Sequence, residues 1–227
     1  MKKMFLLLLL SVSCLLAGCQ APKSGVVEKK ISKNLKQPYY VFRPDNYDSK
    51  MPVAVVVPGG GEDETRVLET LKKYAVRDNF VLVVQGFNPG FSGFRNKEDL
   101  QFIGMVQDLK DSLNINYSNL YLLGFAEGAT FVQRVAMMYP ALVKSAVLIN
   151  GPAFYPFTKN ANSVKILLLA DSATFKENQK FLQALEAQGF KAQLQSFTAN
   201  EPELTEQAGK TAFAFFLQNL KTSKENK

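Results

Sequence analysis

The chain lacks histidine and tryptophan altogether and has two cysteines among its 227 residues. Histidine is the side chain that titrates nearest neutral pH, so its absence removes the usual general base of hydrolytic catalysis. It also removes the commonest ligand of zinc, and the carboxylates show no ligand spacing for a metal ion. The sequence contains no phosphate-binding loop and no dinucleotide fingerprint. We therefore expect neither a metal nor a cofactor.

Both cysteines lie near the start of the chain, in a segment that is typical of export. Lys2 and Lys3 precede an apolar run over residues 4–17, which leads into the sequence LAGC at 16–19. The run is shorter than the roughly 20 residues that a membrane span needs, as expected for a signal peptide. Its ending resembles a bacterial lipobox, which implies cleavage before Cys19 and lipidation of that cysteine. An ordinary signal peptide with an incidental cysteine is the alternative.

This reading divides the chain into four parts. Residues 1–18 are expected to be the lipoprotein signal peptide, and 19–37 a lipidated N-terminus with a flexible tether. Residues 38–220 form one domain, followed by a basic tail at 221–227. Cleavage removes Cys14, so the mature chain has no intrachain disulfide and depends on its core. The lipobox resemblance implies the cell envelope. Gln20, which is not aspartate, implies the outer membrane, on its periplasmic or surface face, where a bacterium has two membranes.

The formal net charge of +7 at pH 7 raises the question of an anionic partner. The lysines are scattered and are not interleaved with aromatic residues, which argues against nucleic acid. They are densest in the tether, where they could attract acidic lipid head groups or simply keep a linker solvated. The lipid anchor thus makes the membrane one partner, and a small ligand, a polymer end or an envelope protein remains open as the other.

After the tether, apolar runs of strand length alternate with stretches of helical period, and runs such as VAVVV, VLVV and ILLL are apolar on both faces. Strands are predicted at 39–43, 52–57, 80–84, 120–123, 146–149, 164–170 and 192–197. Helices are predicted at 97–113, 130–139, 175–188 and 203–220. This alternation predicts a three-layer α/β/α sandwich with a mostly parallel sheet and no large cap domain. Ligands of such sheets bind at the carboxyl ends of the strands.

Two loops at those ends carry recognisable motifs. PGGGEDE follows the strand at 52–57, and GFAEGA follows the strand at 120–123. Glycines in the first could aim backbone N–H groups at a ligand, and glycines on both sides of Ala126 suit a strained nucleophile elbow. In this order and spacing the loops resemble the α/β-hydrolase superfamily, in its polyhydroxybutyrate depolymerase and feruloyl-esterase-like branch. The resemblance runs from residue 39 to about 220 and is strongest over 52–152.

The same resemblance shows that the catalytic residues are missing. Ala126 stands at the position of the nucleophilic serine, and Pro58 at that of a frequent histidine. The acid position falls on Thr174, or on Asp171 in a shifted register. The histidine position falls near Asn200 in a chain that has no histidine. The resemblance therefore implies a degenerate Ser-His-Asp triad.

The oxyanion hole of this fold is built from backbone amides, so it could outlast the side chains. Its donors would be the amide of Glu127 and one near Gly60, at the start of a helix whose dipole favours negative charge. The ligand-binding candidates are Gly59, Gly60, Gly61, Phe125, Ala126 and Glu127. Glu127 could itself fill the anion site, or it could be a favourable first-turn acid and no more.

These observations leave three functional hypotheses. The first is a non-catalytic ligand- or partner-binding pseudo-hydrolase at the envelope. The alternative is an atypical esterase that uses Asp171 or Glu127 on an activated ester. Ser92 could replace the nucleophile only with Lys97 or a carboxylate as its base, which no spacing supports. A third possibility is a scaffold kept for stability and display. The loop residues Phe87, Phe91 and Phe94 could line an apolar pocket or pack that loop against the domain.

Overall fold

The computed structural model describes residues 25–31, 38–86, 98–115, 119–151, 159–198 and 206–225. Several residues singled out from the sequence lie outside these ranges: Cys19, Phe87, Phe91, Ser92, Phe94, Lys97 and Asn200.

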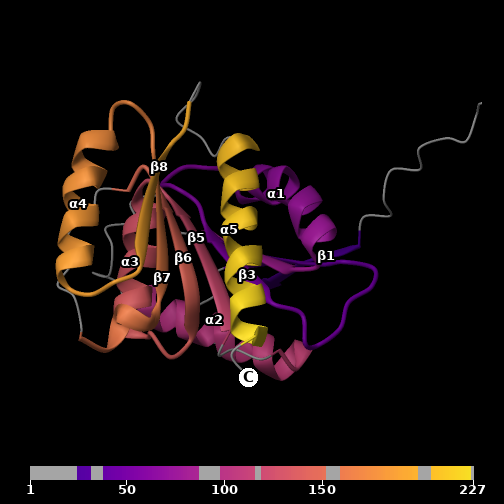
Figure 1. Cartoon of the computed structure of the whole chain (residues 1–227). Helices are drawn as coiled ribbons and strands as arrows, with labels where there is room; N and C mark the ends of the chain where they lie inside the picture. Colours follow the sequence, from indigo (N-terminus) through magenta and orange to yellow (C-terminus); the bar gives the residue numbers. More distant parts are fainter. Residues whose placement is uncertain are drawn as a thin grey trace, which may run out of the picture.

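One eight-stranded sheet forms the middle layer, in the order β1-β2-β4-β3-β5-β6-β7-β8 (Figure 1). β1 pairs antiparallel with β2, and β2 antiparallel with β4, whereas all other neighbours are parallel. The strands are β1 (Val26–Ile31), β2 (Pro38–Arg43), β3 (Val53–Val57), β4 (Val81–Gln85), β5 (Leu120–Phe125), β6 (Val143–Ile149), β7 (Lys165–Ala170) and β8 (Ala192–Ser196).

Helices cover both faces of this sheet. α1 and α5 pack on one face, and α2, α3 and α4 on the other, which gives each face its own apolar core. The helices are α1 (Glu64–Asp78), α2 (Glu98–Leu113), α3 (Glu127–Met138), α4 (Phe175–Ala187) and α5 (Glu206–Glu225), with a short 3₁₀ helix, η2 (Lys159–Ser163). The predicted three-layer sandwich with a mostly parallel sheet is confirmed, and the described residues contain no large cap domain. None of the described helices is both long and apolar enough to cross a bilayer.

The central strands form because their side chains are apolar on both faces, as a parallel strand between two helical layers requires. In β3 all five residues are at most 2 % exposed. On the α1 and α5 side, Phe80 lies at the centre of an aromatic cluster. Its ring centroid is 5.3 Å from that of Tyr121, 5.6 Å from that of Phe213 and 6.1 Å from that of Phe216. These contacts join α5 to the sheet.

The structure corrects the sequence prediction at three places. Residues 26–31 are strand β1 of the sheet, so the prediction of a flexible tether over 19–37 is wrong there. α1 was not predicted, although Asp63 caps it and apolar residues recur at helical spacing along it. α5 extends to Glu225, so helix occupies most of the predicted basic tail at 221–227.

Replacing Phe80 by alanine should lower the free energy of unfolding by about 3–5 kcal/mol, because the side chain is fully buried and its loss leaves a cavity. Urea denaturation followed by circular dichroism measures the change. Met138→Ala is the control, since that side chain is 44 % exposed and its truncation should change stability by less than about 0.5 kcal/mol. Equal effects of the two substitutions would contradict the packing described above.

Candidate functional site

The turn between β5 and α3 has a strained backbone at its apex. Ala126 has φ 49° and ψ −117°, the conformation of the first central residue of a type II′ turn, which glycine normally occupies. Its amide donates a hydrogen bond of 2.9 Å to the carbonyl of Ile149. Its carbonyl accepts from the amide of Ala129 at 3.0 Å, within the first turn of α3. The apex is thus fixed to β6 on one side and to α3 on the other.

The glycines around Ala126 are required because other backbone segments leave no room for side chains. A Cβ atom on Gly124 would lie 2.4 Å from the carbonyl oxygen of Gly128. A Cβ atom on Gly128 would lie 2.1 Å from the carbonyl oxygen of Val57 and 2.5 Å from that of Pro58. Contacts this short do not occur between real atoms, so the elbow can form only with glycine at both positions.

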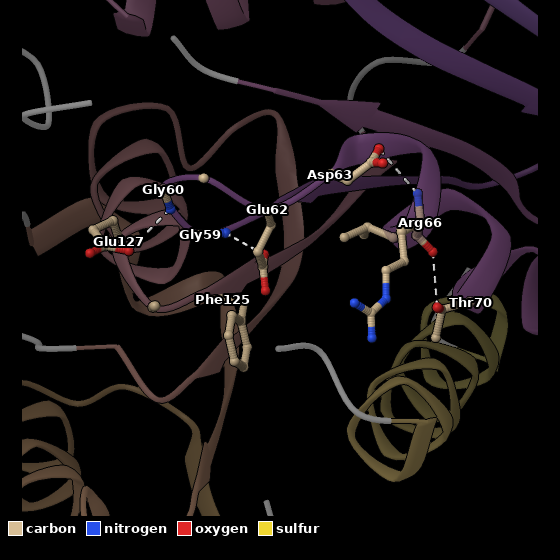
Figure 2. A pocket seen from close by; sticks show the side chains of 11 residues that line it. Gly59, Gly60, Glu62, Asp63, Arg66, Thr70, Phe125 and Glu127 are labelled. Atoms are coloured by element: carbon tan, nitrogen blue, oxygen red, sulfur yellow. Dashed lines mark hydrogen bonds between the residues drawn. The ribbon is translucent and has the colours of Figure 1, made fainter. Parts of the chain in front are cut away.

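The glycine loop after β3 lies against this elbow, and its amides bind carboxylates of the same chain (Figure 2). The amide of Gly59 donates a hydrogen bond of 2.6 Å to Oε2 of Glu62. The amide of Gly60 donates one of 3.2 Å to Oε2 of Glu127, the first residue of α3. The Glu127 carboxylate therefore occupies a backbone donor near the place where an oxyanion hole is expected.

A pocket of about 500 Å³ opens beside this contact. The glycine loop and the residues after it, 59–63, form one wall, and 125–127 of the elbow form another. Arg66, Val67 and Thr70 of α1 complete the lining. A volume of this size is within the usual range for small-molecule sites. The six ligand-binding candidates named from the sequence all line this pocket.

Charged groups give the pocket its character. Its lining residues include the acidic Glu62, Asp63 and Glu127 and the basic Arg66. Asp63 is the N-cap of α1 and accepts hydrogen bonds from Thr65, at 2.6 Å from the hydroxyl and 2.8 Å from the amide. Hydrogen bonds from Thr65, mainly from its hydroxyl and secondly from its amide, hold the pKa of Asp63 below its usual value. The Asp63 carboxylate therefore serves as the N-cap of α1.

Asp171 and Thr174, the alternative acid positions, belong to a separate network at the end of β7. Asn150, after β6, donates from Nδ2 to Asp171 Oδ2 at 2.9 Å, and its Oδ1 accepts from the Thr174 hydroxyl at 2.9 Å. Asp171 Oδ1 accepts from the amides of Ala173 and Thr174 at 3.0 and 2.9 Å. The Asp171 carboxylate therefore closes the loop before α4, and these residues do not line the pocket beside Ala126.

Asn150 was not predicted from the sequence as the partner of both acid candidates. Its φ of 49° places it in the left-handed region, which asparagine tolerates better than most residues. A signal existed, because an asparagine directly after a buried strand favours a turn of this kind.

Within the described ranges, no group of three Cys, Asp or Glu residues is arranged to hold a metal ion.

Comparison with known proteins identifies the fold. No protein-family model matches the sequence, and no curated protein matches it. Many solved structures match, with low sequence identity. An esterase from Rhizomucor miehei is 17 % identical, with a TM-score of 0.71 over 89 % of this chain and 85 % of that one. A ferulic acid esterase is 14 % identical, with a TM-score of 0.69 over 86 % of this chain and 97 % of that one.

A third match is S-formylglutathione hydrolase from Staphylococcus aureus, which is 13 % identical, with a TM-score of 0.69 over 85 % of this chain and 95 % of that one. The chain has the α/β-hydrolase fold. Its structural neighbours are esterases and serine hydrolases, but identities this low establish the fold alone.

Ala126→Gly should raise the free energy of unfolding by about 1 kcal/mol, because glycine adopts this conformation without strain and that gain exceeds the added entropy of the unfolded chain. Urea denaturation provides the measurement. Ala136→Gly is the matched control, since Ala136 lies buried within α3 and its replacement should destabilise by about 1 kcal/mol. Destabilisation by both substitutions would refute the strained conformation of Ala126.

Proposed function

We propose that this chain is a cell-envelope lipoprotein with an α/β-hydrolase fold that does not catalyse and instead binds a ligand or partner in the pocket beside Ala126. The observation that carries the proposal is the methyl group of Ala126 at the apex of an otherwise intact elbow. At the point where this fold presents a nucleophile, the chain has none.

The chain also lacks the base that a serine nucleophile needs. It contains no histidine to accept a hydroxyl proton and return it to a leaving group. Loss of a complete triad lowers kcat by on the order of 10⁶. Asp171 is held by Asn150 and Thr174 in the loop before α4, which commits its carboxylate to local hydrogen bonds. These features support a binding role over a catalytic one.

The contacts of the glycine loop indicate what the ligand would replace. The bond from Gly60 to Glu127 is the longer of the two, at 3.2 Å, and its acceptor lies at an exposed position. The bond from Gly59 to Glu62 is 2.6 Å and partly buried. A carboxylate or carbonyl oxygen of a ligand would therefore displace Glu127 from Gly60 more easily than Glu62 from Gly59. Candidate occupants are a small ligand, a polymer end or a segment of an envelope protein.

An atypical esterase is the second candidate, and the position of Glu127 favours it. Its carboxylate lies against the glycine loop at the mouth of the elbow, where a nucleophile or base could reach a bound ester. The two candidates differ in turnover and in covalent labelling, which a single set of assays can separate.

The purified protein should neither react with a fluorophosphonate probe nor turn over short-chain aryl esters, because Ala126 offers no nucleophile. Ala126→Ser should remain inactive as well, since no histidine is available to activate the serine. Sustained turnover that is lost on Glu127→Gln, Asp171→Asn or Ser92→Ala would instead establish the esterase.

Glu127→Ala should increase binding of short carboxylates, since it frees the amide of Gly60 at the pocket. A carboxylate at about 100 times its Kd would then stabilise the variant by roughly 2.7 kcal/mol, which thermal unfolding detects. Glu177→Ala is the matched control, because Glu177 is also a first-turn acid, on α4, and lies outside the pocket lining. The same ligand response in both variants would count against a carboxylate site at Gly60.

A further inference from the structure

β1 forms one edge of the sheet and exposes several apolar side chains. The described residues include five large apolar side chains that are exposed, and three of them are on β1. Val26 is 53 % exposed, Val27 is 41 % exposed and Ile31 is 63 % exposed. The other two, Leu100 and Met138, lie singly on helices. Isolated exposed apolar residues are ordinary, but a group of them on one strand indicates a contact surface.

The two faces of β1 differ in chemistry. Val27, Lys29 and Ile31 lie on the face toward α1, because the register places Val27 opposite Phe42 and Lys29 opposite Tyr40. The Lys29 ammonium lies 5.5 Å from the centre of the Tyr40 ring. This face therefore combines exposed aliphatic side chains with a cation.

A second lysine stands near the same face. The ammonium of Lys72, on α1, lies 5.5 Å from the centre of the Phe42 ring and 3.4 Å from the Glu69 carboxylate. On the opposite face of β1, the Glu28 carboxylate pairs with both Arg43 and Lys30. Val26 and Lys30 also lie on that opposite face, but the α1 side carries two exposed aliphatic side chains, Val27 and Ile31, beside Lys29.

The short chain between Cys19 and β1 limits how far this edge of the sheet can lie from the membrane. Cys19 precedes Val26 by seven residues, which span at most about 25 Å when fully extended. If Cys19 carries lipid, the start of β1 at Val26 must lie within that distance of the bilayer. β8, at the opposite edge, is seven strand spacings away, or about 33 Å. The anchor therefore limits how far the start of β1 can lie from the membrane and sets no comparable limit on β8.

We propose that the α1-side face of β1, formed by Val27, Lys29 and Ile31, is a second membrane contact that rests on an anionic bilayer. The aliphatic side chains enter the head-group region and Lys29 binds lipid phosphate, as in other interfacial contacts that combine apolar and basic residues. The proposal rests on the lipidation of Cys19 in the proposed function and is independent of what the pocket binds. Its consequence is a fixed orientation of the domain on the membrane.

Hydrogen exchange of the full-length lipidated chain tests this contact. The chain is reconstituted into phosphatidylcholine vesicles with or without phosphatidylglycerol, and compared with the soluble Cys19→Ser chain. Exchange over Val26–Ile31 should slow by about tenfold on the anionic vesicles and less on the neutral ones. Exchange in β8 should not change, which makes the opposite edge an internal control.

Two test variants, each with a matched control, separate a membrane contact of β1 from a non-specific slowing of exchange near the vesicle surface. Val27→Ser with Ile31→Ser should abolish most of the slowing, whereas Leu100→Ser with Met138→Ser removes exposed apolar side chains elsewhere and should leave it intact. Lys29→Glu should remove the dependence on phosphatidylglycerol, and Lys180→Glu, an exposed lysine on α4, should preserve it.

The remaining outcomes contradict the proposal in distinct ways. Unchanged exchange in β1, or equal slowing in β8, would exclude a specific contact of this face with lipid. Exchange over Val26–Ile31 that slows in the soluble Cys19→Ser chain as its concentration is raised would indicate that a second copy covers β1. An intact mass without lipid at Cys19 would remove the premise. Ester turnover, in contrast, would overturn the proposed binding function of the pocket and leave the membrane contact unaffected.

Discussion

The close approach of three backbone segments at the start of α3 determines the geometry of the whole site. Gly124 and Gly128 let β5, α3 and the end of β3 meet at distances that a single Cβ atom would prevent. Because the carbonyl of Val57 packs directly against Gly128, the glycine loop that follows β3 must lie over the elbow. The amide of Gly60 consequently faces the side chain of Glu127.

The elbow persists for reasons of packing, whatever side chain stands at its apex. A conformation like that of Ala126 costs about 1–3 kcal/mol and survives only where its surroundings enforce it. Relaxing it would break the bond from Ala126 to Ile149 and separate α3 from β6. A preserved elbow is therefore evidence of fold and not of catalysis. The same holds at Asp171, whose carboxylate closes the loop before α4.

Sequence patterns predicted those parts of the molecule that burial dictates. Strands such as β3 are apolar on both faces, so the three-layer arrangement followed from them, and the parallel topology placed the glycine loop beside the elbow. β1 was missed because VVEKKI carries charges on both faces, which an edge strand with a single neighbour tolerates. The contact of Glu127 with Gly60 was one of two alternatives that the sequence offered for this residue. The contact of Glu62 with Gly59 was not predicted, since it depends on the rotamer of a flexible side chain.

Moving β1 from the tether into the sheet changes how the pocket would face its surroundings. If the α1-side face of β1 rests on the membrane as proposed, the strands run along the bilayer plane and their carboxyl ends open sideways. The pocket, at the ends of β3 and β5, is three or four strand spacings from β1, or about 14–19 Å from that edge. A ligand would then reach Gly60 and Glu127 from the aqueous side. The proposed orientation would therefore suit a soluble ligand, a polymer end or a protein segment better than a membrane lipid.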